Sequence, residues 1–344
     1  SAVRLVRSSP DAKDLCDRVI DHADRTGGRD SRVRARVGAG HVLAAGHRIE
    51  DGRLRLAEAA SIAGGDPQLV KPVLLAEVEL ATRQGDFKRA LVILGELRTI
   101  VHASSDDQEE HRVALHLAQS HAAVGDRTTA LRNLQEAERL LPFDRTAALE
   151  RTKIHAVVDY FTRDFRSAAM RSEEAIHLAR EMGLAHEVML NLHSLGNILV
   201  HLDDLPRAYG AVRQSLALCE ESGDERFANY NRMLLAFLDG IQGTDGTSPT
   251  PPGQASEGER LRQGIAYAAS KEFTLDVIGG RLLLANLLRR LGQADVARTE
   301  YEKTHALAVE AGHRLVADDC QIALADLAAT TTAQSLARNS KSAL

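Results

Sequence analysis

Three polar residues of this sequence, spaced four residues apart, are the group that most resembles a reactive cluster: His193, Asn197 and His201. Side chains at this spacing share one face of a helix, and imidazole is a common ligand of zinc. His193 and His201 would stand two turns apart, about 12 Å along the helix, and the amide between them is a poor ligand for transition metals. The spacing therefore predicts a polar helix face and no metal site.

The rest of the sequence lacks the motifs that would carry catalysis. It has no glycine-rich phosphate loop ending in Lys-Ser or Lys-Thr, no HExxH, no GxSxG and no kinase catalytic phrase. Cys16, Cys219 and Cys320 lie far apart without a paired spacing, which predicts small buried side chains rather than disulfides or thiolate metal ligands. We expect a protein that is not an enzyme and uses no cofactor.

Composition narrows the possible partners. The 344 residues carry a formal net charge of −5, which gives no electrostatic footprint for nucleic acid or for an anionic membrane. Aromatic residues make up 3% and tryptophan is absent. No run approaches the about 20 apolar residues of a membrane span. We expect a cytoplasmic protein with no direct contact to nucleic acid or membrane, cut from a longer chain, since the sequence begins with Ser.

A six-residue phrase recurs along the chain and indicates which elements position these side chains. Each copy has a small or turn residue, a polar residue, three variable positions and an alanine. The copies end at Ala90, Ala130, Ala168, Ala208 and Ala297, so the first three intervals are 40, 38 and 40 residues. Self-similarity at this period is typical of a solenoid of stacked helix pairs. The sequence therefore predicts an all-α fold.

The residues at the joints fit this pattern. Aspartates such as Asp86, Asp164 and Asp204 stand where second helices would begin and can accept their free amide hydrogens. Glycines such as Gly183 and Gly223 stand where second helices would end and can adopt the left-handed conformation. The predicted pairs span 31–65, 67–104, 107–142, 145–183, 185–223, 224–271 and 273–312, followed by a final helix near 314–329.

The chain divides into three predicted segments. Residues 1–30 are expected to form an N-terminal capping helix or a truncated repeat, and residues 31–312 the repeat array. A Gly, Pro and Ser/Thr-rich stretch at 242–256 has almost no apolar side chains, which predicts a flexible insertion within the array. It is either a tolerated insertion or a regulatory loop. Residues 313–344 are expected to form a capping helix and a disordered tail.

The repeats resemble the tetratricopeptide repeat (TPR). With Ala208 as the family's small residue of the second helix, Leu192, Leu195, Gly196 and Leu199 fall on its packing positions in the first. The period near 40 rather than about 34, the missing first-helix tryptophan and the missing terminal proline depart from the family pattern. The resemblance implies a right-handed superhelical solenoid of antiparallel helix pairs. Long units of this kind are similar to sensor regions of bacterial signalling proteins, including STAND-type regulators, Ser/Thr kinases and peptide-sensing regulators.

The resemblance also implies a partner site. Members of the family bind an extended peptide or a helix on the concave surface formed by their first helices, often with an asparagine holding the peptide backbone. In this sequence Gln119, Asn197 and Asn286 fall on that asparagine position. The concave positions carried over are Glu79, Arg83, Gln119, Lys153, Val157, Tyr160, His193, Asn197, His201, Met233, Phe237, Asn286, Arg289 and Arg290. Ordinary solvated side chains on a curved surface are the alternative for these positions.

We therefore expect a non-catalytic interaction module with a protein or peptide in the concave groove, serving as the sensing part of a larger signalling or transcription-regulating protein. The alternative is a receptor domain for a small inducer, controlling an attached ATPase, kinase or DNA-binding effector. A groove lined by Asn, Arg and Lys favours a peptide or an anionic partner, whereas a closed pocket around Tyr160 and Phe237 favours a small ligand. Oligomeric state and the identity of the effector are left open.

Overall fold

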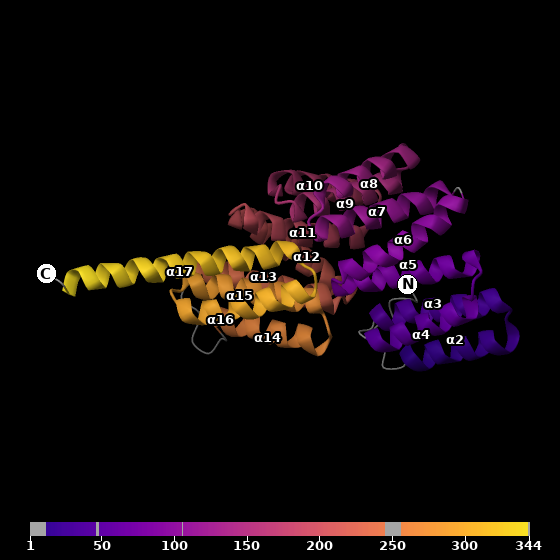
Figure 1. The fold of residues 1–344 in the computed structure, drawn as a ribbon, viewed down its shortest axis with the longest axis horizontal. Coiled ribbons are helices and arrows are strands. Elements are labelled where there is room, and N and C mark those ends of the chain that lie inside the picture. Colours follow the sequence, from indigo (N-terminus) through magenta and orange to yellow (C-terminus); the bar gives the residue numbers. More distant parts are fainter. Residues whose placement is uncertain (1–11, 46–47, 105, 245–255, 343–344) are drawn as a thin grey trace. The chain divides into compact units, whose positions relative to one another are not determined.

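The computed structural model describes residues 12–45, 48–104, 106–244 and 256–342, and over these residues it contains sixteen helices and no strand (Figure 1). The helices are α2 (Ala12–Thr26), α3 (Arg29–Ala45), α4 (Ile49–Ala63), α5 (Pro67–Gln84), α6 (Phe87–Ser104), α7 (Asp107–Ala123), α8 (Arg127–Leu140), α9 (Arg145–Phe161), α10 (Phe165–Glu181), α11 (Ala185–His201), α12 (Leu205–Ser222), α13 (Glu225–Thr244), α14 (Glu257–Ser270), α15 (Thr274–Arg290), α16 (Ala294–Glu310) and α17 (Arg314–Ser342). Each predicted pair corresponds to two of these helices, so the all-α solenoid is confirmed.

The helices begin and end at the capping residues that the sequence predicts. Asp164 and Asp204 accept hydrogen bonds through Oδ1 from the backbone N–H groups of Ser167 and Arg207, at 3.2 and 3.4 Å. These bonds satisfy amides that a helix N-terminus otherwise leaves free. At the other end, Gly223 closes α12 with φ of 70°, which an L side chain rarely adopts.

The turn inside each of the five pairs that carry the repeat phrase also has a residue with positive φ. Gly85, Gly125 and Gly292 supply it where the repeat phrase begins with glycine. Where the repeat phrase has no glycine, Arg163 and Asp203 adopt it, with φ of 64° and 57°. Glu272, at the joint between α14 and the next pair, also has a positive φ, of 56°. A non-glycine residue in this region is strained by roughly 1–2 kcal/mol.

The alanines of the repeat phrase are the points of closest packing. Ala90, Ala130, Ala168, Ala208 and Ala297 are all fully buried, with 0% of their surface exposed. In the pair α11–α12 the first helix contributes a small residue as well, because a Cβ atom at Gly196 would lie 2.4 Å from a methyl carbon of Val212. Small residues thus allow the helices of a pair to approach each other closely.

The chain separates into two compact units, whereas the sequence suggests one continuous array. Unit 1 comprises residues 1–121 and 128–147, and unit 2 comprises residues 122–127 and 148–344. The division falls near the connection between α8 and α9, where Phe143 is 98% exposed. A solenoid repeat is stabilised only by its neighbours, so a joint with little buried side chain becomes a boundary.

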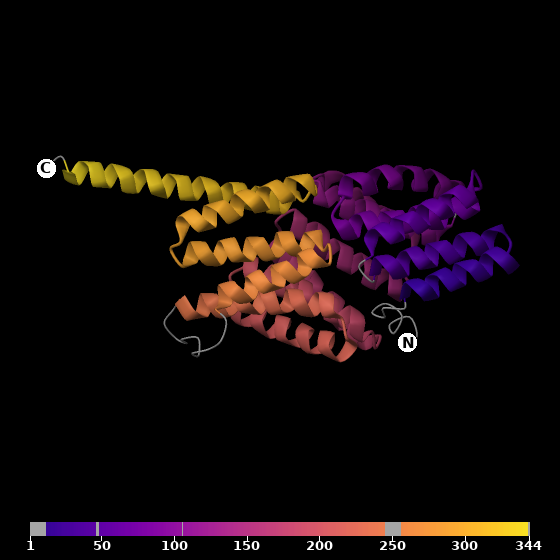
Figure 2. The ribbon, with the colours of Figure 1, turned by 90° about the horizontal axis from the view of Figure 1, so that it is seen from below.

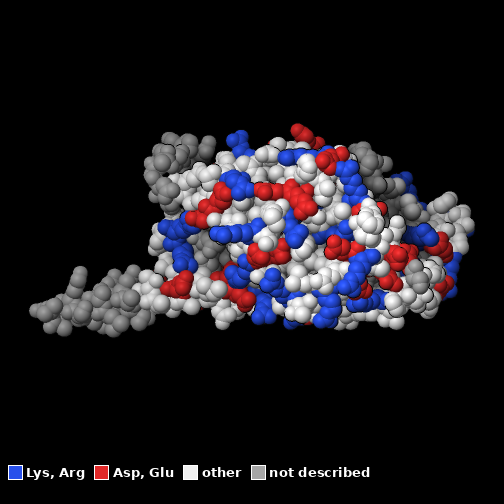
Figure 3. Space-filling view, turned by 90° about the horizontal axis from the view of Figure 1, so that it is seen from above, with Lys and Arg blue, Asp and Glu red and all other residues white. Residues whose placement is uncertain are grey.

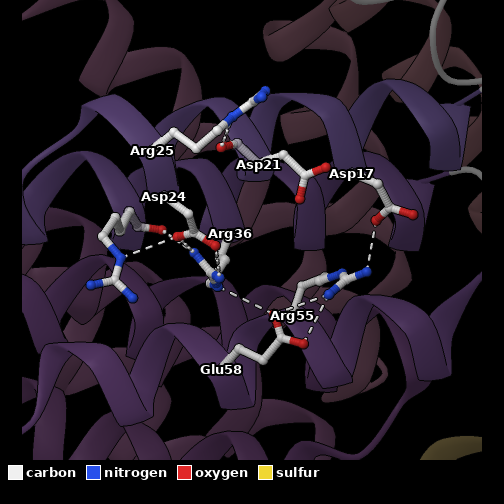
Figure 4. Close-up of polar contacts among 8 residues, drawn as sticks. Asp17, Asp21, Asp24, Arg25, Arg36, Arg55 and Glu58 are labelled. Atoms are coloured by element: carbon white, nitrogen blue, oxygen red, sulfur yellow. Dashed lines mark hydrogen bonds and ion pairs between the residues drawn. The ribbon is translucent and has the colours of Figure 1, made fainter.

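An ion-pair network joins α2, α3 and α4 of unit 1 (Figure 4). Arg36 of α3 donates to both carboxylate oxygens of Asp24 of α2, at 2.8 and 2.7 Å, and to Glu58 of α4 at 3.2 Å. Arg55 of α4 donates to Asp17 of α2 and to Glu58. Hydrogen bonds from the guanidinium of Arg36 hold the pKa of Asp24 at about 2. The network fixes the packing of α2 against α3 and α4.

Unit 2 has one large core and carries the pairs α9–α10 to α15–α16, closed by α17. Consecutive helices pack against each other, and the first helices also pack side by side, α11 on α13, α13 on α15 and α15 on α17. Figure 2 shows α17 extending past the ends of α15 and α16. The helix continues to Ser342 rather than ending near 329 before a disordered tail, because no Gly or Pro interrupts residues 313–342.

Other expectations concern the insertion, the cysteines and the surface. Most of the predicted insertion, residues 245–255, lies outside the described residues, and α13 continues to Thr244. Cys16, Cys219 and Cys320 are buried and unbonded to one another, as predicted. No helix among the described residues is long and apolar enough to cross a membrane. Lys/Arg and Asp/Glu side chains are interspersed on the face drawn in Figure 3.

We predict that Ala208→Leu destabilises unit 2 by about 1–3 kcal/mol, because the added side chain overpacks a fully buried helix contact. Chemical denaturation monitored by circular dichroism measures the change. The matched control is Ala217→Leu on the exposed side of the same helix, which is expected to unfold like the wild type. Equal stability of the two variants would contradict the packing described for Ala208.

We predict that Glu272→Gly stabilises the protein by roughly 0.5–1 kcal/mol, since relief of left-handed strain exceeds the entropy cost of glycine. The reciprocal change, Gly312→Ala, places a side chain at the corresponding joint after the next pair, between α16 and α17, where φ is 72° and a Cβ meets no atom within 4 Å. It is expected to destabilise by a similar amount. Thermal melts that move in the same direction for both variants would refute the strain argument.

Candidate functional site

Unit 2 contains a cavity of about 780 Å³ on the inner side of its first helices. Its walls are formed by α9, α11, α13 and α15, with His313 and Val316 closing it at the start of α17. The lining residues on α15 extend from Leu275 to Arg290, a distance of about 22 Å along a helix. The volume lies in the range of ligand sites in proteins.

The structure brings most of the predicted concave residues of unit 2 to this cavity. The residues of the predicted set that line it are Lys153, Val157, Tyr160, His193, Asn197, His201, Phe237, Asn286, Arg289 and Arg290. Met233 does not line the cavity; it is 1% exposed and packs in the core. Glu79, Arg83 and Gln119 belong to unit 1, where Glu79 and Arg83 line a different, very small pocket with His41.

An aromatic cluster forms one part of the wall. The ring of His201, the last residue of α11, stacks on Phe165 with centroids 4.4 Å apart and planes inclined by 5°. Tyr160 of α9 meets both rings edge-on, and its hydroxyl lies 3.3 Å from Nε2 of His201. Burial raises the pKa of Tyr160 and lowers that of His201. Both side chains are therefore neutral near pH 7 and present mainly ring surface to a ligand.

A chain of hydrogen bonds fixes the protonation of His193. The hydroxyl of Ser215 donates to the carbonyl of Met189, and Asn231 donates through Nδ2 to that hydroxyl oxygen at 2.9 Å. The Oδ1 atom of Asn231 is thus directed to His193 Nδ1, 2.8 Å away, and an oxygen can only accept. His193 consequently carries its proton on Nδ1. Its Nε2 is an acceptor, and burial keeps its pKa below the ordinary value.

The same series of hydrogen bonds determines the orientation of the Asn197 side-chain amide. Its Nδ2 group donates to the carbonyl oxygen of His193 at 3.1 Å and lies 3.4 Å from Nε2 of the same residue. Both hydrogens of the amide are thereby directed toward His193. The Oδ1 atom is left as the group that Asn197 offers to the cavity. Asn197 is an acceptor in this wall.

Asn286 on α15 is oriented the opposite way. The hydroxyl of Tyr301, a fully buried residue of α16, donates to Asn286 Oδ1 at 2.6 Å. The amide N–H groups of Asn286 remain as donors on its other side. The cavity therefore pairs an acceptor on α11 with a donor on α15, and a trans peptide group offers the complementary N–H and C=O.

The arginines of the cavity fall into two classes. Arg226, at the start of α13, donates to both carboxylate oxygens of Asp276 at 2.9 and 2.8 Å. Burial opposes the charge of Arg226, but the hydrogen bonds and the attraction of Asp276 outweigh it and raise its pKa. Arg289 and Arg290 have partners 3.2 and 3.6 Å away in partly exposed pairs. Such exposed pairs are weak, so these two cations can exchange partners for a ligand.

Sequence reasoning missed Arg226 and Asp276, which are fifty residues apart and form the buried ion pair of this wall. Asp276 lies in the first turn of α15, where an acid normally interacts with the helix dipole. The sequence around Asp276 does not distinguish it from an ordinary acidic residue at a helix N-terminus. Its role depends on the packing of α13 beside α15.

The arrangement supplies several kinds of binding group. Among the residues that the structure describes, no group of three or more His, Cys, Asp or Glu is placed to hold a metal ion. The carboxylate of Asp276 is engaged by Arg226. The cavity offers ring faces, two oppositely oriented amides and two loosely paired cations.

Comparison with known proteins establishes the fold. No family model matches the chain, and no curated protein matches it significantly. A solved structure of a Rap protein complexed with competence and sporulation factor is 13% identical, with a TM-score of 0.55, and the match covers 94% of this chain and 99% of that chain. The apo form of RapI is 10% identical, with a TM-score of 0.51 and 94% of each chain covered.

A third similar structure, aspartyl phosphate phosphatase F from Bacillus subtilis, is 11% identical, with a TM-score of 0.50, and the match covers 94% of this chain and 90% of that chain. Identities this low carry information on the fold alone. The TPR-like helical-repeat fold predicted from the repeat phrase is thereby confirmed.

We predict that the stability of unit 2 falls as the pH is lowered from about 7 toward 4. Burial lowers the pKa of His313 from 6.5 to about 4, so the unfolded chain binds a proton that the folded chain excludes over this range. His313→Asn removes this titration and keeps an acceptor for the backbone N–H of Val316. The melting temperature of His313→Asn should therefore decline less between pH 7 and 5.

The exposed His186 provides the control for this experiment. His186→Asn is expected to keep the wild-type decline, because water solvates that imidazole in both the folded and the unfolded chain. A wild-type decline in His313→Asn would show that burial of His313 does not couple stability to pH.

Proposed function

We propose that this chain is a non-catalytic receptor module that binds a short extended peptide in the cavity of unit 2 and transmits its occupancy to an attached effector domain. The observation that carries the proposal is the opposed orientation of Asn197 and Asn286 in one cavity. An acceptor on one wall and a donor on another match the main-chain groups of a peptide. The module is proposed to act in the cytoplasm.

The dimensions of the cavity support a peptide of limited length. A span of about 22 Å accommodates roughly six extended residues at 3.3 Å each. The ring surfaces of Tyr160 and His201 provide apolar contact for side chains, and Arg289 and Arg290 attract an anionic group. A solved Rap protein of the same fold is complexed with competence and sporulation factor, which supports a binding role for the fold.

A small-molecule inducer is the second candidate, because Tyr160 and Phe237 do line one common cavity. Such pockets are mostly apolar with a few oriented polar groups. The two candidates differ in what a ligand must contain. A peptide needs repeated amide groups, whereas an aromatic inducer needs only ring contacts and one or two hydrogen bonds.

We predict that the chain selects binders from a pooled library of peptides about six residues long, measured by affinity selection and mass spectrometry. For a selected peptide, Asn197→Ala should weaken binding by about 1–3 kcal/mol, because a main-chain N–H of the ligand loses its acceptor. Charge reversal at Arg289 and Arg290 should mainly slow association, with a loss that shrinks as salt rises.

The matched control is Arg262→Glu on α14, a second helix, where the side chain is 51% exposed and does not line the cavity. It should bind like the wild type. If Arg262→Glu abolishes binding while the Asn197 and arginine variants retain it, the partner binds outside the cavity. If no peptide is selected but a small-molecule screen yields a binder sensitive to Tyr160→Ala, the inducer function replaces the peptide function.

A further inference from the structure

One position of the second helices is exceptional in the wall of the cavity. Four residues after the repeat alanine the chain has, in order, Leu94, Leu134, Ser172, Val212 and Tyr301. All five side chains are at most 7% exposed. Four of them are large, and Ser172 alone is small. The pair α9–α10 therefore lacks the volume that the other four pairs place here.

Two of the large residues show where this position points. Val212 lies against Gly196 of α11, the first helix of its own pair. Tyr301 reaches Asn286 of α15, again the first helix of its own pair. The position thus fills the space behind the first helix, between the cavity and the second-helix layer. With only a serine there, the cavity of unit 2 reaches that layer.

The lining of the cavity agrees with this geometry. Ser172 is the one second-helix residue among the cavity-lining residues in the described part of the chain. Consecutive helices run antiparallel, so residues at equal distances from the turn that joins two helices lie at the same level. By this count Ser172 on α10 lies level with about residue 154 on α9 and residue 194 on α11. Ile154 and Ser194 both line the cavity. The recess therefore opens between α9 and α11.

The hydroxyl in this recess is unsatisfied. Ser172 is 0% exposed, and its Oγ atom has no hydrogen-bond partner among the residues that the structure describes. A buried polar group without a partner is costly, which is why such groups are rare in folded proteins. By contrast Ser215, equally buried on α12, donates to a carbonyl and accepts from Asn231. The Ser172 hydroxyl can therefore form a hydrogen bond with a group that enters the recess.

The neighbouring wall offers acceptors. On α11, Asn191 donates through Nδ2 to the carbonyl of Glu187 at 2.8 Å, and the hydroxyl of Ser194 donates to the carbonyl of Leu190 at 3.1 Å. Both residues line the cavity. The hydroxyl hydrogen of Ser194 and one amide hydrogen of Asn191 are directed back to the helix, and the oxygens of both residues can receive a ligand donor.

We propose that this recess is a subsite for a short neutral polar group of the ligand, a hydroxyl or a carboxamide. Such a group accepts the hydrogen of the Ser172 hydroxyl and donates one to an oxygen of Asn191 or Ser194. An apolar group would leave the serine unpaired. A charged group would be buried without a counterion, since Lys153 is already paired with Glu187. The proposal rests on the peptide function above and names the side chains that the peptide carries here, those of Ser, Thr, Asn or Gln.

The test uses peptides selected from the pooled library, with each Ser, Thr, Asn or Gln replaced in turn by alanine. At one position the replacement should weaken binding to the wild type by about 5- to 100-fold. The same replacement should have little effect on Ser172→Ala, because the partner is already lost, which makes a double-mutant cycle strongly non-additive. Ser172→Val, which supplies the side chain of the next pair, should reduce affinity for the parent peptide at least as much.

Stability of the free protein provides the second measurement. Ser172→Ala should melt at or above the wild-type temperature, because it removes a buried unpaired hydroxyl. Ser215→Ala, the matched control with both hydrogen bonds made, should melt lower. A lower melting temperature for Ser172→Ala would mean that the hydroxyl is satisfied within the fold, and would overturn the subsite.

The remaining outcomes separate this inference from the proposed function. If peptides bind, but the loss of affinity on replacing each polar side chain of the peptide is additive with the loss caused by Ser172→Ala, the subsite is refuted while the peptide function stands. If the replacements that are non-additive with Ser172→Ala are only those of charged or apolar side chains of the peptide, the assignment of a neutral polar group is refuted. If no peptide is selected at all, both the peptide function and the subsite fall.

Discussion

The close approach of paired helices at the repeat alanines is the constraint on which the rest of the structure depends. Each of the five alanines is fully buried, and a side chain longer than a methyl group there would force the pair apart. Because the first helices of unit 2 lie side by side, any change in the spacing of a pair would shift the wall of the cavity. The residues that line the cavity are thus held in place by residues that do not line it.

Hydrogen-bond direction gives the cavity its chemical character. The amide of Asn286 is oriented by Tyr301 from the layer behind it, and the amide of Asn197 by His193. The orientation of His193 depends in turn on Asn231 and Ser215. Identical side chains on two walls therefore become a donor and an acceptor. A binding site built in this way selects a ligand by the polarity of its groups as well as by its shape.

The same register relates the site to the repeat. The position four residues after the alanine packs behind the first helix as Val212, supports a cavity residue as Tyr301, and leaves a recess as Ser172. A repeat protein can thus vary the floor of a binding site by changing one buried residue per unit. The backbone need not change, since each unit is stabilised by its own neighbours.

Much of the lining of the cavity could be predicted from the sequence, because its residues recur at the period of the fold. Once Ala208 sets the register, residues such as Asn197 and Asn286 fall on first helices and on their inner faces. Met233 was assigned to that face wrongly and lies in the core, since the face of a helix that borders both a groove and a neighbouring helix is divided by packing. The ion pair of Arg226 with Asp276 was missed because it joins two helices fifty residues apart.

The sequence by itself determined the helical pairs, their turns and their caps, since these depend on interactions between residues close along the chain. Asp204 caps α12 and Gly223 ends it for reasons that a stretch of about twenty residues contains. Only the tertiary structure decided that the chain forms two units, that the groove of unit 2 encloses a cavity, and which way each amide points. Those outcomes depend on buried contacts between helices far apart in sequence, and hydrogen bonds of that kind leave no local pattern.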